Sequence, residues 1–342
     1  MESLSVRYKI FITFLLCMGS IAHAQDLHFS QYFNAPMLQS PANTALMPES
    51  DYRAGINYRT QWGAIPVPFN TFSAYADMQV MRNRNLTNWM GVGVVFFSDR
   101  AGDGNLALTK GMANIAYHIQ LDDANMLSVG LCGGYAQRSI DIGKLTFDVQ
   151  WDGFKFNRDK INGESNTVAK SGYMDLGAGL NYAWFPNDAT YIKFGAGLMH
   201  INQPKESLLK NADNKIGMRP TAMVDALLKL NTGWIANPSV YYTFQRGASE
   251  LLFGSQFSCN VSPSERKPNS LYMGAYYRLG DAVIALAGFE WQQIRVVGTY
   301  DITVSSLSNA NGGNGAFEIS VSYQGLFGAG SIDRNAYSCP RF

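Results

Sequence analysis

The chain has few charged residues. Lys, Arg, Asp and Glu make up 15% of its 342 residues, against about 25% in typical soluble domains. The 27 basic and 26 acidic residues leave a formal net charge of +1, so the composition does not predict a nucleic acid or a strongly charged protein as partner. Aromatic residues reach 13%. This balance is unusual for a cytosolic protein.

Residues that catalyse reactions or bind metals are also scarce. Outside the N-terminal leader described below, the histidines are His28, His118 and His200. A hydrolase needs a nucleophile and a base within hydrogen-bond reach, and the sequence contains no G-x-S-x-G, no HExxH and no phosphate-binding loop with its Lys. We therefore predict no enzyme activity, no catalytic residue, no metal and no cofactor.

Long hydrophobic runs are absent, with one exception at the N-terminus. Arg7 and Lys9 precede an apolar run from Ile10 to Ile21, and Ala22-His23-Ala24 follows it. A basic start, an apolar run and an A-x-A site are the three parts of a secretory signal peptide. Residues 1–24 are therefore predicted to be a signal peptide. Elsewhere no window approaches the roughly 18 uninterrupted apolar residues of a membrane helix.

Cysteine is rare as well. Beyond the signal peptide only Cys132, Cys259 and Cys339 remain, an odd number for a protein exported to an oxidising compartment. No CxxC or Cys/His spacing indicates a metal site. Cys132 and Cys259 fall in strand-like segments, where we expect them to pack as small hydrophobic residues.

The chain does contain many segments with apolar residues at every second position. In Met174 to Trp184 the even-numbered residues are apolar, whereas Asp175, Gly177, Gly179 and Asn181 occupy the other face. A period of two indicates a β-strand. In a soluble sandwich the second face would be rich in Lys, Glu and Thr, but here it is mostly Gly with isolated charges.

The same pattern recurs along the chain. Fourteen segments show it: 52–58, 69–78, 89–97, 110–120, 126–137, 174–185, 190–200, 221–230, 235–245, 250–261, 270–279, 282–291, 294–305 and 316–323. Most have about the 9 to 11 residues that a tilted strand needs to cross a bilayer, and the even count is typical of bacterial outer-membrane barrels. We therefore predict an all-β fold, a transmembrane antiparallel β-barrel over residues 52–323.

The connections support this prediction. If Tyr52 starts on the periplasmic side, the outer connections include 60–68, 98–109, 138–172 and 201–220, and the inner ones include 121–125, 186–189 and 231–233. Long outer loops and short inner turns are typical of outer-membrane barrels. A soluble all-β protein is the alternative, but it would have to bury nearly all fourteen apolar faces in one core.

Aromatic residues toward the strand ends are expected to form an interfacial girdle. They are Trp89, Trp184, Phe185, Trp234, Tyr241, Tyr242, Tyr276, Tyr277 and Trp291. The opposite face carries both charge signs in similar numbers, among them Arg59, Arg278, Asp301 and Glu318. This favours an interior braced by ion pairs over a selective ion pore.

Two segments flank the predicted barrel. Residues 25–51 contain Pro36, Pro41 and Pro48 and show no clear period, so we expect an irregular segment that lies in the periplasm or enters the lumen. Residues 324–342 form a C-terminal tail. In it Cys339, Pro340, Arg341 and Phe342 make a candidate docking peptide for a periplasmic partner, or else Phe342 contributes to recognition by the barrel-assembly machinery.

An ordered set of short motifs resembles one known family. The set includes "FSQYFNAPMLQSPANTAL" after the signal peptide, "YRTQW", "LTFDVQWDG", "INQPKES", "PSVYY", "GAYYRL", "TYDITVSSL", "GAFEISVSY" and the terminal "CPRF". Together they resemble the PorP/SprF family of type IX secretion system membrane proteins. The chain departs from the family pattern at Ser40-Pro41-Ala42-Asn43-Thr44-Ala45, where the family is expected to have Asn-Pro-Ala-Tyr-Ala-Gly.

The resemblance implies a function. It implies a Gram-negative outer-membrane barrel that supports secretion or surface attachment of particular cargo, including gliding-motility adhesins, and that contacts other components of the type IX machinery. Among the outer connections, the longest holds Phe147, Trp151, Phe154 and Phe156 among charged residues, as protein contact surfaces do. We predict that it binds the cargo's C-terminal sorting domain, with an inward-folded lid as the alternative.

Two other functions use the same fold. A channel or transporter for small hydrophobic solutes would have a continuous lumen, whereas a secretion accessory can have a plugged one. A purely structural outer-membrane protein would have no specific protein partner.

Overall fold

The computed structural model describes residues 29–47, 50–61, 69–82, 87–157, 159–163, 167, 169–209, 213–261 and 269–327. The predicted signal peptide and the predicted docking residues Cys339, Pro340, Arg341 and Phe342 lie outside these residues. Within them, no helix is both long enough and apolar enough to cross a membrane.

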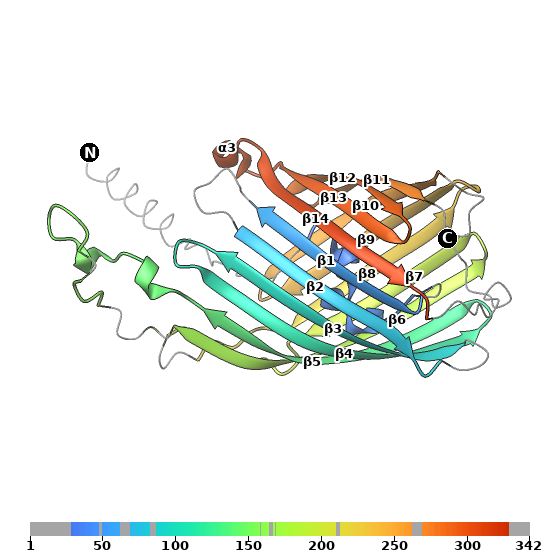
Figure 1. The fold of residues 1–342 in the computed structure, drawn as a ribbon, viewed down its shortest axis with the longest axis horizontal. Coiled ribbons are helices and arrows are strands. Elements are labelled where there is room, and N and C mark those ends of the chain that lie inside the picture. The colour runs from blue at the N-terminus through green and yellow to red at the C-terminus, as the bar shows by residue number, and fades with distance from the viewer. Residues whose placement is uncertain are drawn as a thin grey trace, which may run out of the picture.

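The described chain folds as a closed antiparallel barrel in which every strand pairs with its neighbours in sequence (Figure 1). β1 and β14 complete the ring through a register that runs from Tyr52 opposite Gly325 to Gln61 opposite Ala316. The strands are β1 (Tyr52–Gln61), β2 (Phe69–Val80), β3 (Asn88–Ala101), β4 (Leu106–Asp122), β5 (Asn125–Ser139), β6 (Lys170–Asn187), β7 (Thr190–Met199), β8 (Arg219–Lys229), β9 (Trp234–Gln245), β10 (Ala248–Asn260), β11 (Ser270–Arg278), β12 (Ala282–Trp291), β13 (Ile294–Thr303) and β14 (Asn314–Gly325).

The predicted all-β barrel is confirmed, and each of the fourteen alternating segments falls on its own strand, although five of them were predicted to end one or two residues beyond it. Several strands extend beyond the apolar alternation, since β4 starts at Leu106 and β6 at Lys170. Backbone pairing continues there, through Ala107 opposite Ser139, although the side chains no longer alternate between apolar and polar. The strands therefore end where backbone pairing ends, not where the apolar alternation ends.

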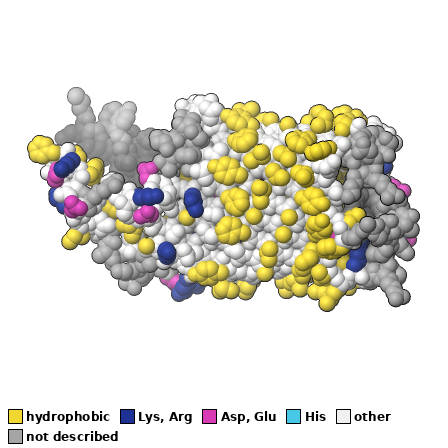
Figure 2. Space-filling model, in the orientation of Figure 1, with side chains coloured by type: hydrophobic (Ala, Val, Ile, Leu, Met, Phe, Trp, Pro, Cys, Tyr) yellow, Lys and Arg dark blue, Asp and Glu magenta, His cyan; other side chains and the backbone are white. Residues whose placement is uncertain are grey.

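The two faces of each strand meet different surroundings. On β1, Ile56 and Tyr58 are 49% and 44% exposed, whereas Asn57 and Arg59 are 1% and 2% exposed. Apolar side chains cover much of the outer face of the barrel in Figure 2. The glycine-rich face of Met174 to Trp184 points inward, because Asp175 and Asn181 are buried while Met174 and Leu180 are exposed.

The connections differ between the two ends of the barrel. Residues 140–169 and 200–218 join strands at one end, called here the long-loop end, and residues 123–124, 188–189 and 292–293 join strands at the other, the short-turn end. Two tight turns, 246–247 and 279–281, also occur at the long-loop end. Short helices interrupt the irregular parts: η1 (Tyr32–Asn34), α2 (Pro36–Gln39), η2 (Pro41–Asn43), η3 (Ile142–Lys144), η4 (Asp148–Gln150) and α3 (Ser308–Asn311).

The predicted aromatic girdle is only partly correct. Trp184, Trp234, Tyr242 and Trp291 are exposed on the outer face, but four members of the set are buried inside the barrel: Trp89, Phe185, Tyr241 and Tyr276. Consecutive residues of a strand point to opposite faces. A pair such as Tyr241-Tyr242 can therefore place only one ring in the interface.

Candidate functional site: the filled lumen and the long-loop surface

Residues 29–47, called here the luminal segment, run inside the barrel from the long-loop end to the short-turn end. Ser30 lies beside Arg59, near the long-loop end of β1. The carbonyl of Met47 accepts a hydrogen bond of 2.5 Å from Gln79 Nε2, next to the short-turn end of β2. Nearly every residue between is buried. The luminal segment therefore spans the length of the lumen as an irregular chain with three short helical turns.

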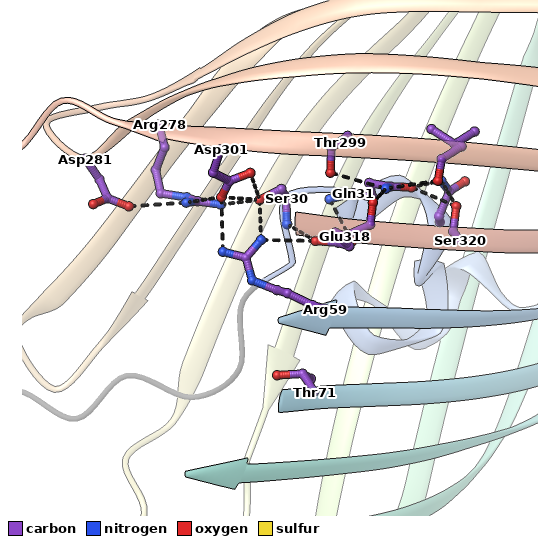
Figure 3. Close-up of polar contacts among 12 residues, drawn as sticks. Ser30, Gln31, Arg59, Thr71, Arg278, Asp281, Thr299, Asp301, Glu318 and Ser320 are labelled. Atoms are coloured by element: carbon purple, nitrogen blue, oxygen red, sulfur yellow. Dashed lines mark hydrogen bonds and ion pairs between the residues drawn. The ribbon is translucent and has the colours of Figure 1, made fainter. Parts of the chain in front are cut away.

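A charged network holds the start of the luminal segment (Figure 3). Arg59 Nη2 lies 3.0 Å from Asp301 Oδ2 and its Nη1 lies 3.2 Å from Glu318 Oε2. Arg278 Nη1 lies 3.0 Å from the same oxygen of Asp301. Ser30 Oγ donates to Asp301 and accepts from Arg59 Nη1 at 2.6 Å. Side chains from β1, β11, β13 and β14 thus converge on one serine.

Glu318 also binds the backbone of the luminal segment. Its carboxylate accepts from the N–H groups of Ser30 and Gln31 at 2.9 and 3.1 Å. Gln31 Nε2 donates to the Glu318 carbonyl at 3.0 Å and to Thr299 Oγ1 at 3.2 Å. A buried charge is tolerated when ion pairs and hydrogen bonds satisfy it. Here those partners come in part from the luminal segment, so barrel and segment stabilise each other.

A row of small residues on the inner wall receives the middle of the luminal segment. Gly91, Ala116, Gly130, Gly179 and Gly197 face one another in register across β3, β4, β5, β6 and β7. A β-carbon at Gly130 would lie 2.4 Å from the backbone nitrogen of Ala42, and one at Gly197 would lie 2.3 Å from the carbonyl oxygen of Gln39. The inward glycines of the sequence pattern are thus positions of close backbone approach.

Three polar side chains hold the end of the luminal segment. Asp77 Oδ2 accepts from the backbone N–H of Ala45 at 2.7 Å, and Trp89 Nε1 donates to the Ala45 carbonyl at 2.9 Å. The Nε2 atom of His118 lies 2.8 Å from the carbonyl oxygen of Thr44. His118 is therefore a structural residue of the lumen.

The predicted interior of paired charges agrees with the geometry. Arg53 pairs with Asp77, Lys193 with Asp225 and Arg295 with Glu290. Lys229 is exposed, because it is the last residue of β8 and lies at the rim.

The remaining buried histidine belongs to a second ionic cluster. His200 Nδ1 lies 2.9 Å from Asp175 Oδ1, and Lys110 pairs with the other oxygen of the same carboxylate. A His–Asp pair orients the base in many hydrolases, but both side chains are at most 2% exposed here. The described residues contain no group of three His, Cys, Asp or Glu that could hold a metal ion. This cluster braces the wall.

The four aromatic residues predicted to bind cargo lie on the connection between β5 and β6. Trp151 and Phe156 form an isolated β-bridge and an edge-to-face ring contact with centroids 5.1 Å apart. Phe154, between them, is 94% exposed, and Trp151 and Phe156 are each 48% exposed. Phe147 is half-buried. Trp151 and Phe156 are thus in contact, and Phe154 lies on the turn between them. These three residues are called here the aromatic tip, whereas Phe147 immediately precedes η4.

Asp152 fixes the turn that carries Phe154. Its Oδ1 accepts from the backbone N–H groups of Phe154 and Lys155 at 3.0 and 2.9 Å. The hydrogen bond from the Lys155 N–H, followed by that from Phe154, lowers the pKa of the Asp152 carboxyl below its ordinary value. Asp and Asn favour such turns because their short side chains bond the backbone two residues on.

The loop is tied to its neighbours at its base. The backbone N–H of Asp141 donates to the Gly104 carbonyl at 2.8 Å. Arg138 pairs with Glu206, and Thr167 forms a bridge with Leu209 in the connection between β7 and β8. Figure 2 shows this loop projecting from one end of the barrel with apolar and charged side chains interspersed. In Figure 1 the described part of this loop extends away from the barrel rather than into its lumen.

Sequence reasoning missed two elements of the site. The role of Asp152 was detectable, because Asp-Gly at 152–153 is a turn dipeptide. The contacts of the luminal segment were not, since its partners Asp301 and Glu318 lie more than 270 residues away.

Comparison with solved structures identifies the fold. The Ralstonia pickettii toluene transporter TbuX has a TM-score of 0.54 at 10% identity and covers 86% of this chain and 94% of its own. The Pseudomonas putida toluene transporter TodX has a TM-score of 0.51 at 10% identity over 88% and 95%. A Pseudomonas aeruginosa FadL homologue has a TM-score of 0.50 at 10% identity over 83% and 92%. These likenesses show the fold alone.

Sequence comparison identifies the family. The comparison with curated proteins gives no match. The family model described as "Type IX secretion system membrane protein PorP/SprF" matches residues 21–323, which cover the barrel from the start of β1 to two residues before the end of β14. The chain therefore belongs to the PorP/SprF family of type IX secretion system membrane proteins, as a β-barrel of the Gram-negative outer membrane.

Proposed function

We propose that the protein is a non-enzymatic accessory of type IX secretion that supports the secretion or cell-surface attachment of specific cargo, such as gliding-motility adhesins, by binding the cargo's C-terminal sorting domain. The observation that carries this proposal is the aromatic tip. Phe154 is almost fully exposed on a turn that Asp152 holds in shape, at the end of the barrel whose long loops face the cell exterior in proteins of this class.

The aromatic tip has the composition of a binding surface. Aromatic anchors surrounded by polar residues supply most of the energy of protein interfaces, and a pre-shaped loop loses little conformational entropy on binding. The connection between β7 and β8 borders the same loop through Thr167 and Leu209, so it is the second candidate contact.

A channel for small hydrophobic solutes is the second candidate function. The likeness in fold to two toluene transporters favours it. The luminal segment favours the accessory role, because it occupies the lumen along its length through hydrogen bonds to many strands. Transport would require this segment to leave or to shift.

The C-terminal tail is a candidate contact for a different partner, on the periplasmic side. β14 ends at Gly325 beside the start of β1, so the chain leaves the barrel at the short-turn end, which is periplasmic when the long loops face outward. We propose that the predicted docking residues Cys339, Pro340, Arg341 and Phe342 bind a periplasmic component of the type IX machinery.

Replacing Trp151 and Phe154 by Ser tests the cargo-binding proposal. We expect loss of cargo from the surface of intact cells, with the barrel still in the outer membrane. Ile161→Ser is the matched control, since Ile161 lies on the same loop and is 89% exposed but lies outside the aromatic tip. Unchanged surface cargo in the double variant would overturn the proposal.

A further inference from the structure

A cavity of about 310 Å³ lies between the luminal segment and the barrel wall. Arg53, Tyr191 and Gln324 line it, and each is one residue from the short-turn end of its strand. The cavity therefore lies in the short-turn half of the lumen, far from the aromatic tip. Its volume is at the lower end of the roughly 300–1,000 Å³ of small-molecule sites.

One part of the lining is apolar. The luminal segment contributes Phe33, Leu46 and Met47, and the wall contributes Met223 and Leu227. Phe33 is held in place because its ring stacks on Tyr276 with centroids 5.7 Å apart. This surface suits a hydrocarbon chain or ring.

The charged side chains of the lining are paired. Lys193 Nζ lies 3.2 Å from Asp225 Oδ2, and Tyr32 donates to the other oxygen of Asp225 at 3.2 Å. Arg53 pairs with Asp77 at 2.6 Å. A ligand with a net charge would leave one buried charge in excess, which is costly. A ligand whose head is neutral would not.

The lining also contains an acceptor without a donor. Gln39 is 4% exposed, and its Oε1 has no hydrogen-bond partner in the described structure. Native proteins satisfy most buried polar groups. Rotation of the Gln39 amide would turn Oε1 toward the cavity. A ligand with an N–H or O–H group could then donate a hydrogen bond to it.

The wall beside the cavity has an interrupted ladder. Between β8 and β9 the pairing passes from Asp225 opposite Ser239 directly to Leu228 opposite Ala236. Pro238 lacks an N–H group, and the Asn237 side chain instead donates to the Ala226 carbonyl at 2.5 Å. Because this hydrogen bond holds the Asn237 side chain against the wall, the side chain does not extend across the lumen and does not fill the cavity.

We propose that this cavity binds a net-neutral, single-chain amphiphile, with its apolar part against Phe33, Leu46 and Leu227 and its hydrogen-bond-donating head near Gln39 and Asp225. The site needs both the wall and the luminal segment, so a bound ligand stabilises the plugged barrel.

Three probes with the same chain length test the proposal. N-decanoylethanolamine is neutral and carries N–H and O–H donors, decanoate is an anion, and decyltrimethylammonium is a cation. Equilibrium dialysis with labelled probes against the full-length protein in nanodiscs, with empty nanodiscs as blank, measures saturable binding. We expect saturable binding of the neutral probe at least tenfold tighter than that of either ion. Equal or tighter binding of an ion, or no saturable binding, would overturn the proposal.

Two variants locate the site. Leu227→Trp fills the cavity and should weaken binding of the neutral probe at least tenfold, whereas Val224→Trp, on the lipid-facing side of the same strand, should leave it unchanged. Gln39→Leu removes the acceptor and should weaken binding of the neutral probe about tenfold. This second variant tests the location even if the Leu227→Trp barrel does not assemble. Unchanged binding in an assembled Leu227→Trp or Gln39→Leu barrel would contradict this location.

Discussion

Ser40 Oγ lies 2.1 Å from the position that a β-carbon on Gly179 would occupy. The hydroxyl donates to the Ala196 carbonyl at 3.0 Å. The luminal segment therefore contacts the wall at Gly179, where no side chain stands in the way. The inner face of β6 is glycine-rich at this point because another part of the chain, rather than water, lies against it.

Gly130→Ala should therefore displace the luminal segment. The new methyl group would meet the backbone of Pro41 and Ala42, and overpacking of this kind costs about 1–3 kcal/mol. We expect faster proteolysis within residues 29–47 and a lower unfolding temperature. Gly111→Ala is the control, because a β-carbon there meets nothing within 4 Å. Equal behaviour of the two variants would show that the segment is not packed against the glycine row.

Arg59→Met should destabilise the barrel strongly. The variant leaves Asp301 and Glu318 buried with fewer partners, and breaking a buried ion pair costs about 3–5 kcal/mol. Thermal unfolding in detergent, followed by electrophoretic mobility, measures the effect. Lys144→Met breaks an exposed pair with Asp141, and such pairs contribute about 0–1 kcal/mol. If both variants melt at the wild-type temperature, the network at Ser30 does not stabilise the fold.

Asp152→Ala should weaken cargo binding without changing barrel stability, because the turn that presents Phe154 loses its acceptor. Asp152→Asn keeps an oxygen acceptor and should bind nearly as well as wild type. Binding of the purified cargo sorting domain to the barrel measures both. Equal binding by the Ala variant and wild type would mean that the turn is not needed.

The same turn predicts the pH dependence of binding. The pKa of Asp152 is lowered in the fold. The stability that its carboxylate gives the turn is therefore fully present above the ordinary pKa of 3.8 and is lost as the pH falls through the lowered value. Binding through the aromatic tip should therefore not change between pH 8 and pH 5 on account of this carboxyl. A loss of binding near pH 6 in wild type that is absent in Asp152→Asn would contradict this assignment.

Deletion of residues 338–342 tests the role of the tail. If the tail docks onto a periplasmic partner, the barrel should assemble in normal amount and cargo should be lost from the surface. If Phe342 is instead read by the assembly machinery, the barrel itself should disappear from the outer membrane. Immunoblots of outer-membrane fractions beside surface cargo measurements distinguish the two.

The strands could be predicted from the sequence because alternation depends on local residue order. Ile56 and Asn57 point to opposite faces of the sheet because consecutive residues of a strand always do. Trp89 was wrongly placed in the outer girdle. Periodicity shows that its ring is near a strand end, but not that its indole N–H donates to the Ala45 carbonyl inside the barrel. The luminal segment has no period, and its position depends on Arg59, Asp301 and Glu318, which only the closed barrel brings together.

The aromatic tip was predicted in part. Clustering of Trp151, Phe154 and Phe156 within six residues indicated a contact surface, but whether it pointed outward or into the lumen depended on how the loop is tied to Gly104 and Leu209. Those contacts are tertiary, and no local pattern encodes them. The cavity beside Leu227 likewise exists only where wall and luminal segment meet.

If the barrel serves particular cargo of type IX secretion, its loss should remove that cargo and leave other secreted proteins in place. Quantitative mass spectrometry of secreted and surface-exposed proteins, from matched cultures with and without the gene, tests it most directly. We predict that one or a few large secreted proteins with C-terminal sorting domains disappear while other cargo persists. An unchanged surface proteome, together with reduced uptake of a small hydrophobic solute, would contradict the claim and favour a channel.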